Sequence, residues 1–319
     1  MKRTSQKIWT ILIAAVLMCG TGRMKAQFDA MFTQYMFNET FINPAYAGSK
    51  GAMSATLLHR QQWVNFSGRP VTTSFSLHGP LIDDKMGLGL SVLNEKIGVL
   101  QRNLIYGDYA YRLKIQEKGT LALGLMAGVE TQLNKFSELK VNNDNTVDQQ
   151  LSYNTPNVVA PNLGMGAYYH TKTFYGGLSI PRLINNQVSF ENGGAAVKSS
   201  KMQLSKSTYY ITAGNMFVIN EEIKVRANTM IKYVPAAPVQ IDIGGNVLFR
   251  DMFWGGLSYR SGSAISVLLG MQVNSQFLVN YAYDYGVNQI QKYSQGSHEI
   301  VLNYLFSYKG KKVVTPRYF

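Results

Sequence analysis

The chain has 319 residues, of which 46% are hydrophobic and 15% charged, and its formal net charge is +13. The charged fraction is well below the roughly 25% of an average soluble globular protein, which disfavours an ordinary soluble domain. The positive balance is scattered rather than clustered. It therefore indicates an anionic surface or partner and gives no reason to expect nucleic-acid binding.

The first 26 residues have the pattern of a secretory signal peptide. A basic start precedes an apolar run, Ile8 to Gly20, that is too short to span a bilayer. Cleavage after Ala26 would leave a mature chain with a net charge of +8 and no cysteine, because Cys19 is the only one. Lipoprotein processing at Leu17-Met18-Cys19 is the alternative.

Residues 27–50 precede the first predicted strand and carry two distinctive stretches, Gln34–Asn38 and Asn43–Ser49. The Asn-Pro and Ala-Gly-Ser sequences in the second stretch favour turns. We expect an ordered segment that lies against the periplasmic mouth of the following β-structure or inside it. Its candidate partner-binding residues are Asn43, Pro44, Tyr46 and Gly48.

Residues 51–308 repeat a two-faced alternation of apolar and polar side chains. In residues 239–250, for example, Ile241 and Ile243 share one face while Asp242 lies on the other. A period of two indicates strands and excludes amphipathic helices. About 14 strands are predicted, near residues 52–60, 70–78, 86–94, 102–113, 119–131, 162–171, 172–180, 207–218, 223–234, 238–250, 252–261, 263–274, 275–286 and 297–308.

These strands predict an all-β fold, a transmembrane antiparallel β-barrel in the outer membrane. Each strand is near the 9–11 residues that a tilted strand needs to cross a bilayer, and a sheet in lipid must close. The longest connections, residues 132–161, 181–206 and 286–296, all follow odd-numbered strands, as expected for short periplasmic turns and longer extracellular loops. A soluble β-sandwich, the alternative, does not explain this asymmetry. Residues 309–319 form a C-terminal tail.

The two longest connections, residues 132–161 and 181–206, are polar and show no alternation. The connection between the first two predicted strands is different, because it contains Trp63 and Phe66 close to Arg60 and Gln61. An exposed Trp in a loop is unusual. We interpret these four residues as candidate partner contacts, with packing onto the barrel rim as the alternative.

Basic residues on the polar faces of two strands are candidates for the lumen: Lys224, Arg226, Lys232 and Arg250. They form either an anion-attracting stripe or ion pairs with Asp242 or other acids. Aromatic residues on the apolar faces of the last two strands are Tyr281, Tyr283, Tyr285, Tyr304, Phe306 and Tyr308. We expect them at the lipid–water interfaces, with carbohydrate stacking as the alternative.

The sequence offers no catalytic, metal-binding or cofactor-binding residues. The four histidines, His59, His78, His170 and His298, have no ligand at a metal-site spacing. Ser297, His298 and Glu299 are neighbours, but adjacent strand residues point to opposite faces. They therefore cannot act as a nucleophile and base or share a metal. A barrel enzyme would need a catalytic pair across strands, and we expect a non-enzyme.

Four features in this order resemble the PorP/SprF family of outer-membrane proteins of the type IX secretion system. They are Gln34–Asn38 with Asn43–Ser49, Arg60–Trp63 with Phe66, Gly68 and Pro70, Phe253–Arg260, and Gly296–Ile300. The resemblance extends from about residue 27 to residue 308. One departure is Arg69, where the family usually has a small residue.

The resemblance implies a non-enzymatic barrel without cofactor that supports secretion or cell-surface attachment of cargo with a type IX C-terminal signal domain, such as adhesins and proteases. Some members support gliding motility. Others link to a periplasmic peptidoglycan-binding lipoprotein and so to the ring components of the secretion machinery. Outer-membrane lipid is the further expected partner. The alternative is a passive porin or a small-molecule or anion channel.

Overall fold

The computed structural model describes residues 30–81, 84–115, 119–138, 154–191, 194–235 and 237–306. The predicted signal peptide, the predicted C-terminal tail and Tyr308 lie outside these residues.

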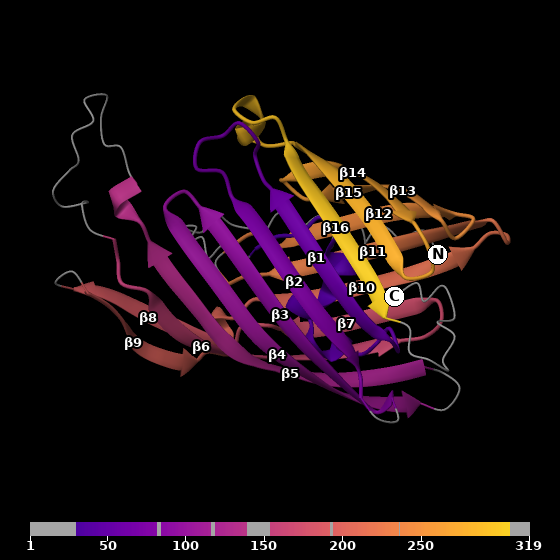
Figure 1. Cartoon of the computed structure of the whole chain (residues 1–319), viewed down its shortest axis with the longest axis horizontal. Coiled ribbons are helices and arrows are strands. Elements are labelled where there is room, and N and C mark those ends of the chain that lie inside the picture. Colours follow the sequence, from indigo (N-terminus) through magenta and orange to yellow (C-terminus); the bar gives the residue numbers. More distant parts are fainter. Residues whose placement is uncertain are drawn as a thin grey trace, which may run out of the picture.

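Within the described residues, fourteen antiparallel strands close a barrel, as the alternation predicted (Figure 1). The first and last strands complete the closure, with Leu57 opposite Leu302. The barrel strands are β1 (Met53–Gln61), β2 (Val71–Pro80), β3 (Met86–Ile97), β4 (Leu100–Ile115), β5 (Gly119–Asn134), β6 (Val158–His170), β7 (Phe174–Ile180), β10 (Tyr209–Val218), β11 (Ile223–Tyr233), β12 (Gln240–Phe249), β13 (Phe253–Arg260), β14 (Ala264–Gln272), β15 (Phe277–Gly286) and β16 (Ser297–Phe306).

Two further strands, β8 (Ile184–Glu191) and β9 (Gly194–Met202), form a separate hairpin between β7 and β10. The interpretation of residues 181–206 as an unpatterned loop is therefore wrong for most of that stretch. The hairpin sequence is mostly polar, so apolar alternation could not reveal it, and cross-strand backbone hydrogen bonds define it instead. Figure 1 shows the hairpin projecting beyond the barrel wall beside β6.

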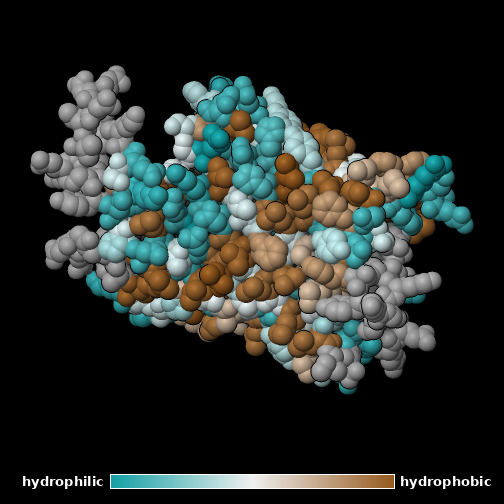
Figure 2. Space-filling view, viewed as in Figure 1, coloured by the Kyte–Doolittle hydropathy of each residue, from teal (hydrophilic) through white to brown (hydrophobic). Residues whose placement is uncertain are grey.

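The outer surface of the barrel is apolar and its inner surface is polar. On β12 the outward Ile243 is 58% exposed, whereas the inward Asp242 is 4% exposed. Figure 2 shows hydrophobic residues across the middle of one face and hydrophilic residues over the loops. This is the arrangement that hydrocarbon around a barrel requires. No helix among the described residues is long and apolar enough to cross a membrane.

The two ends of the barrel differ. In the described part of the chain, the connections at one end, here the inner end, are short and include residues 84–85, 171–173, 219–222, 250–252 and 273–276. The connections at the outer end include residues 62–70, 98–99, 135–138, 154–157, 181–191, 194–208, 237–239, 261–263 and 287–296. In outer-membrane barrels the short turns face the periplasm. The outer wall is uneven, because β4 and β5 have 16 residues each and β13 has 8.

Residues 30–50, here the N-terminal segment, lie inside the barrel. The segment contains three short 3₁₀ helices, η1 (Tyr35–Phe37), η2 (Glu39–Phe41) and η3 (Pro44–Tyr46). From residue 32 to residue 49 every side chain except those of Phe37 and Phe41 is buried. The remaining 3₁₀ helices, η6 (Phe136–Glu138), η8 (Leu204–Lys206) and η9 (Gln289–Lys292), lie in outer connections.

Candidate functional site: the filled lumen and the outer loops

The start of the N-terminal segment binds a buried group of charges near the outer end, here the outer ionic cluster (Arg60, Asp284 and Glu299). Arg60 from β1 contacts Asp284 of β15 at 2.7 Å and Glu299 of β16 at 3.0 Å. The backbone N–H groups of Thr33 and Gln34 donate to the Glu299 carboxylate at 2.9 and 2.7 Å. Arg60 was a candidate partner contact, but in the structure its guanidinium holds the chain's own segment.

Further polar contacts extend this attachment. The Thr33 hydroxyl donates to Asp284 at 2.7 Å and accepts from Arg60 at 2.8 Å. Arg260 at the outer end of β13 donates to the Phe32 carbonyl at 2.7 Å and to Asp242 at 2.8 Å. Charge-assisted hydrogen bonds of this kind are roughly twice as strong as neutral ones. The first residues of the segment are therefore held by polar contacts on several strands.

The middle of the segment is matched by neutral polar groups. Asn38 donates to the Ser74 hydroxyl at 3.1 Å and accepts from Ser76 at 3.2 Å, both on β2. On the opposite side of the lumen, Asn228 of β11 donates to the Tyr35 hydroxyl at 2.8 Å. These bonds satisfy polar groups that would otherwise be buried without partners.

The candidates Asn43, Pro44, Tyr46 and Gly48 lie at the inner part of the lumen, and all four are buried. Asn43 caps η3 by accepting from the Ala45 N–H at 3.0 Å and donates to the Ala167 carbonyl of β6 at 3.0 Å. Asparagine is a strong N-cap residue, and Pro44 occupies the first helical position. These residues contact the barrel wall, so they are not available at the surface to a separate partner.

Gly48 ends the inner part of the segment in a left-handed conformation, φ 76°. Its carbonyl accepts from Arg112 of β4 at 2.8 Å, and its N–H donates to Nδ1 of His78 at 3.2 Å. A Cβ on Gly48 would lie 2.9 Å from the Gly87 Cα. Backbone conformation and space both require glycine here.

The wall around η3 is built from glycines that admit the segment's backbone. A Cβ on Gly124 of β5 would lie 2.2 Å from the Ala45 nitrogen, and one on Gly87 of β3 would lie 2.0 Å from the Ala47 carbonyl oxygen. A Cβ on Gly166 of β6 would meet the Asn43 side chain at 2.1 Å. The wall and the segment therefore fit each other at backbone distance.

The four basic lumen candidates have different environments. Lys224, Arg226 and Lys232 are buried on the inward face of β11. The Arg226 guanidinium stacks 4.8 Å from the Trp254 ring centroid and 5.0 Å from that of Phe37, so it binds the segment by cation–π contact.

Lys224 pairs with Asp251 at 2.7 Å, and the Lys232 ammonium lies 5.6 Å from the Tyr210 ring centroid. Arg250 is not in the lumen, because β12 ends at Phe249 and Arg250 enters a tight turn with φ 52°. Its side chain is 64% exposed beside Glu222.

Of the other loop candidates, Gln61 and Trp63 are half-buried and Phe66 is 38% exposed. Trp63 stacks edge-on against Phe66, with ring centroids 6.3 Å apart. The loop is tied to the β15–β16 connection, because the Val64 N–H donates to the Gly296 carbonyl at 2.8 Å. Trp63 has a left-handed φ of 55°, a conformation that is rare outside glycine and concentrates at functional sites.

The described outer connections are mainly basic. Their charged residues are Arg69, Lys135, Glu138, Arg182, Glu191, Lys198, Lys201, Lys206 and Lys292. Contacts with Lys135 at 3.3 Å and Lys96 at 3.4 Å lower the pKa of the exposed Glu138 carboxyl. The described inner connections hold three basic and four acidic residues, so among the described connections the positive excess lies at the outer end.

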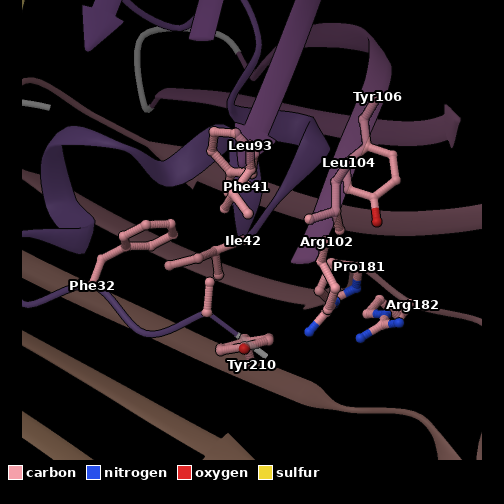
Figure 3. A pocket seen from close by; sticks show the side chains of 11 residues that line it. Phe32, Phe41, Ile42, Leu93, Arg102, Leu104, Tyr106, Pro181, Arg182 and Tyr210 are labelled. Carbon is pink, nitrogen blue, oxygen red and sulfur yellow. The ribbon is translucent and has the colours of Figure 1, made fainter. Parts of the chain in front are cut away.

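A cavity of about 50 Å³ lies beside the segment at the outer end. Figure 3 shows Phe32 on one side and Arg102 and Arg182 on the other. The arginines are held by acids, with Arg182 2.6 Å from Glu130 and Arg102 3.3 Å from Glu95. The full lining is Ala30, Phe32, Phe41, Ile42, Leu93, Arg102, Leu104, Tyr106, Pro181, Arg182 and Tyr210.

The described aromatic candidates of β15 and β16 lie on the outward faces of their strands. Tyr281 and Tyr304 are 36% and 39% exposed, and the Tyr281 hydroxyl lies 2.6 Å from Nδ1 of His298. In the part of the chain that the structure describes, no group of three or more His, Cys, Asp or Glu side chains is placed to hold a metal ion.

The sequence did not reveal the outer ionic cluster or the role of the wall glycines. Asp284 and Glu299 were recognised as polar-face residues of their strands, but nothing in the sequence paired them with Arg60. That pairing depends on barrel closure, which brings β1 beside β16.

Solved structures that are similar to this chain include two with TM-scores of 0.46. The Acinetobacter baumannii outer membrane protein Omp33 is 7% identical, covers 81% of this chain and 100% of its own, and has a TM-score of 0.46. A Pseudomonas aeruginosa FadL homologue is 10% identical, with 83% and 93% covered and a TM-score of 0.46. No curated protein matches this chain.

The family comparison is more extensive. The model of the type IX secretion system membrane protein PorP/SprF matches residues 24–304, which include every barrel strand up to Tyr304 of β16 and the whole N-terminal segment. The chain therefore belongs to the PorP/SprF family of type IX secretion system membrane proteins.

Proposed function

We propose that this protein is a non-enzymatic outer-membrane barrel that supports secretion or cell-surface attachment of type IX cargo, such as adhesins and proteases. Membership of the PorP/SprF family supports a role in this secretion system. The observation that carries the proposal is the filled lumen. Since the N-terminal segment occupies the interior from the Arg60 level to the Gly48 level, the barrel acts through its surfaces rather than as a passage.

The outer end offers the surface for cargo. Strands β4 and β5 extend the wall beyond the length needed to cross the bilayer, and the β8–β9 hairpin projects beside the neighbouring strand β6. Trp63 and Phe66 present aromatic area on a loop that is tied to its neighbour. Aromatic side chains held in place are frequent centres of protein interfaces. The basic charge of the outer connections favours an acidic cargo surface.

A periplasmic peptidoglycan-binding lipoprotein or ring component is the proposed partner at the inner end. Because Asn43, Pro44, Tyr46 and Gly48 are buried, we propose the short inner turns as the surface for this contact. A role in gliding motility would follow if the cargo is an adhesin. The filled lumen argues against the passive porin or channel.

The test replaces the β8–β9 hairpin, residues 184–202, by a short Gly/Ser turn. We expect the barrel to reach the outer membrane in normal amount while surface cargo falls at least about tenfold, since loss of a contact surface worth 1.4 kcal/mol has this effect. The matched control replaces residues 234–239, an outer connection that holds no charged or aromatic residue, in the same way and should leave surface cargo unchanged. A second variant lacks the hairpin and also has Gly/Ser in place of the Trp63 loop, residues 62–70. A normal amount of cargo on the surface of cells with this variant would contradict the proposal.

A further inference from the structure

The N-terminal segment crosses the lumen from the outer end to the inner end. Ala30 lines the outer cavity with Arg102 and Tyr210, which lie near the outer ends of their strands. Gly48, at the other end of the segment, contacts His78 and Arg112 near the inner ends of theirs. Since β1 begins at Met53, the chain passes down through the lumen before it turns into the barrel wall.

The two halves of the segment are held in different ways. The inner half, residues 42–49, meets the wall at backbone distance, because Gly87, Gly124 and Gly166 leave no room for a side chain. Such a close-packed fit leaves no space into which the inner half can shift.

The outer half, residues 30–41, is held by side chains of the wall. The outer ionic cluster binds it through Thr33 and Gln34, and Phe32, Tyr35 and Met36 belong to an apolar cluster with residues such as Leu93 and Leu104. The cavity lies next to this cluster, so one side of the outer half faces empty space and not packed side chains. Because the wall holds the outer half through side chains, a partner with its own backbone N–H groups can take over these contacts.

We propose that the outer half of the N-terminal segment is a releasable element, which a polypeptide partner bound at the outer mouth displaces while the inner half stays in place. This inference rests on the proposed function, because cargo is the polypeptide expected at the outer mouth. Displacement removes Thr33 and Gln34 from Glu299, and an apolar side chain of the partner enters the cavity beside Phe32. Binding of cargo thereby moves the outer half of the segment inside the lumen.

The experiment measures the reactivity of single cysteines in intact cells with a maleimide that does not cross membranes. Met36→Cys reports the outer half and Ala45→Cys the inner half, both in a Cys19→Ser background. Met36 and Ala45 are 6% and 0% exposed, so both cysteines should react slowly in the otherwise unchanged barrel.

The variant Glu299→Gln removes the charge that accepts from Thr33, Gln34 and Arg60. We expect it to raise the labelling rate of Met36→Cys about tenfold and to leave Ala45→Cys unchanged. Glu222→Gln is the matched control, since it breaks an exposed ion pair with Arg250 at an inner turn. Thr33→Val, which leaves every barrel strand intact, repeats the test if Glu299→Gln lowers the amount of folded barrel. Equal labelling of both cysteines, or no change at either, would overturn the proposal.

A second arm adds the C-terminal signal domain of a secreted protein of the same cells to the Met36→Cys barrel. Faster labelling supports displacement by the partner. Binding in a pull-down without faster labelling overturns the inference and leaves the proposed function standing. Absence of binding contradicts the proposed function, while the Glu299→Gln result still reports on the segment.

Discussion

At the scale of single residues, the fit between wall and segment depends on missing side chains. Gly124 and Gly166 belong to adjacent strands, and each lies against the η3 region at a distance that excludes a Cβ. Elsewhere on the barrel a glycine has no such role, since a Cβ on Gly245 would meet nothing within 4 Å. Adding a side chain to a wall glycine is therefore expected to disturb packing on the inward face and not on the outward face.

We expect Gly124→Ala to destabilise the folded barrel by about 1–3 kcal/mol, because an added methyl group in a packed site forces the backbone to shift. Gly245→Ala, which points outward from β12, should change stability by less than about 0.5 kcal/mol. Thermal unfolding in detergent, followed by the loss of the compact barrel on gels, measures both. Equal effects of the two substitutions would contradict the close fit.

Two buried carboxylates of the lumen should respond differently to neutralisation. Glu299 accepts from two backbone N–H groups and Arg60, whereas Oε2 of Glu39 has no hydrogen-bond partner among the described residues. Glu39→Gln should be neutral or stabilising, while Glu299→Gln should destabilise by about 1.5–3 kcal/mol, the usual contribution of a hydrogen bond to a charged group. The same thermal unfolding assay compares them. A larger loss for Glu39→Gln would refute this assignment.

At the scale of elements, alternation was enough to predict the barrel strands. In strands such as β11 and β12, lipid and lumen select opposite residue types at successive positions, so the sequence carries a period of two. The β8–β9 hairpin escapes this signal because it does not separate two media. Arg250 was misplaced for a related reason, since two left-handed residues turn the chain out of the strand before the alternation would end.

The N-terminal segment shows the limit of sequence reasoning more clearly. Its turn-forming residues indicated order, but both the mouth and the interior of the barrel remained open as its location. The contacts that determine the location join residues far apart in the chain, such as Gln34 with Glu299 and Asn43 with Ala167. A single sequence without the barrel register contains no signal for such pairs.

The lipid-facing surface gives a direct prediction for one strand. Ile243 lies in the middle of β12 and is 58% exposed, so Ile243→Arg should place a charge near the bilayer centre. This costs about 2–4 kcal/mol in transmembrane barrels and should reduce the amount of folded protein in the membrane fraction.

Met252→Arg is the control, because Met252 is exposed at an inner turn rather than within a strand. We expect little change in the membrane fraction for this variant. Tolerance of Ile243→Arg together with loss of Met252→Arg would mean that the lipid band is misplaced.

At the scale of the whole molecule, the barrel combines an apolar outside with an interior occupied by its own chain. The segment is joined to the inner end of β1 and attached near the outer end by ionic contacts, so it bridges the two mouths. The two ends are unequal, because the described inner turns are short and hold three basic and four acidic residues, whereas the described outer connections are longer and mainly basic. This difference between the two ends is the basis for proposing a different protein partner at each end.

The most direct test of the filled lumen is conductance of the purified barrel in planar bilayers, with and without residues 30–47. We expect the complete protein to show no steady open channel. The deletion variant should show a steady conductance, since a barrel of this strand number has a lumen wider than its own inward side chains fill. A steady open channel in the complete protein, or an equally silent deletion variant that is folded, would contradict the account.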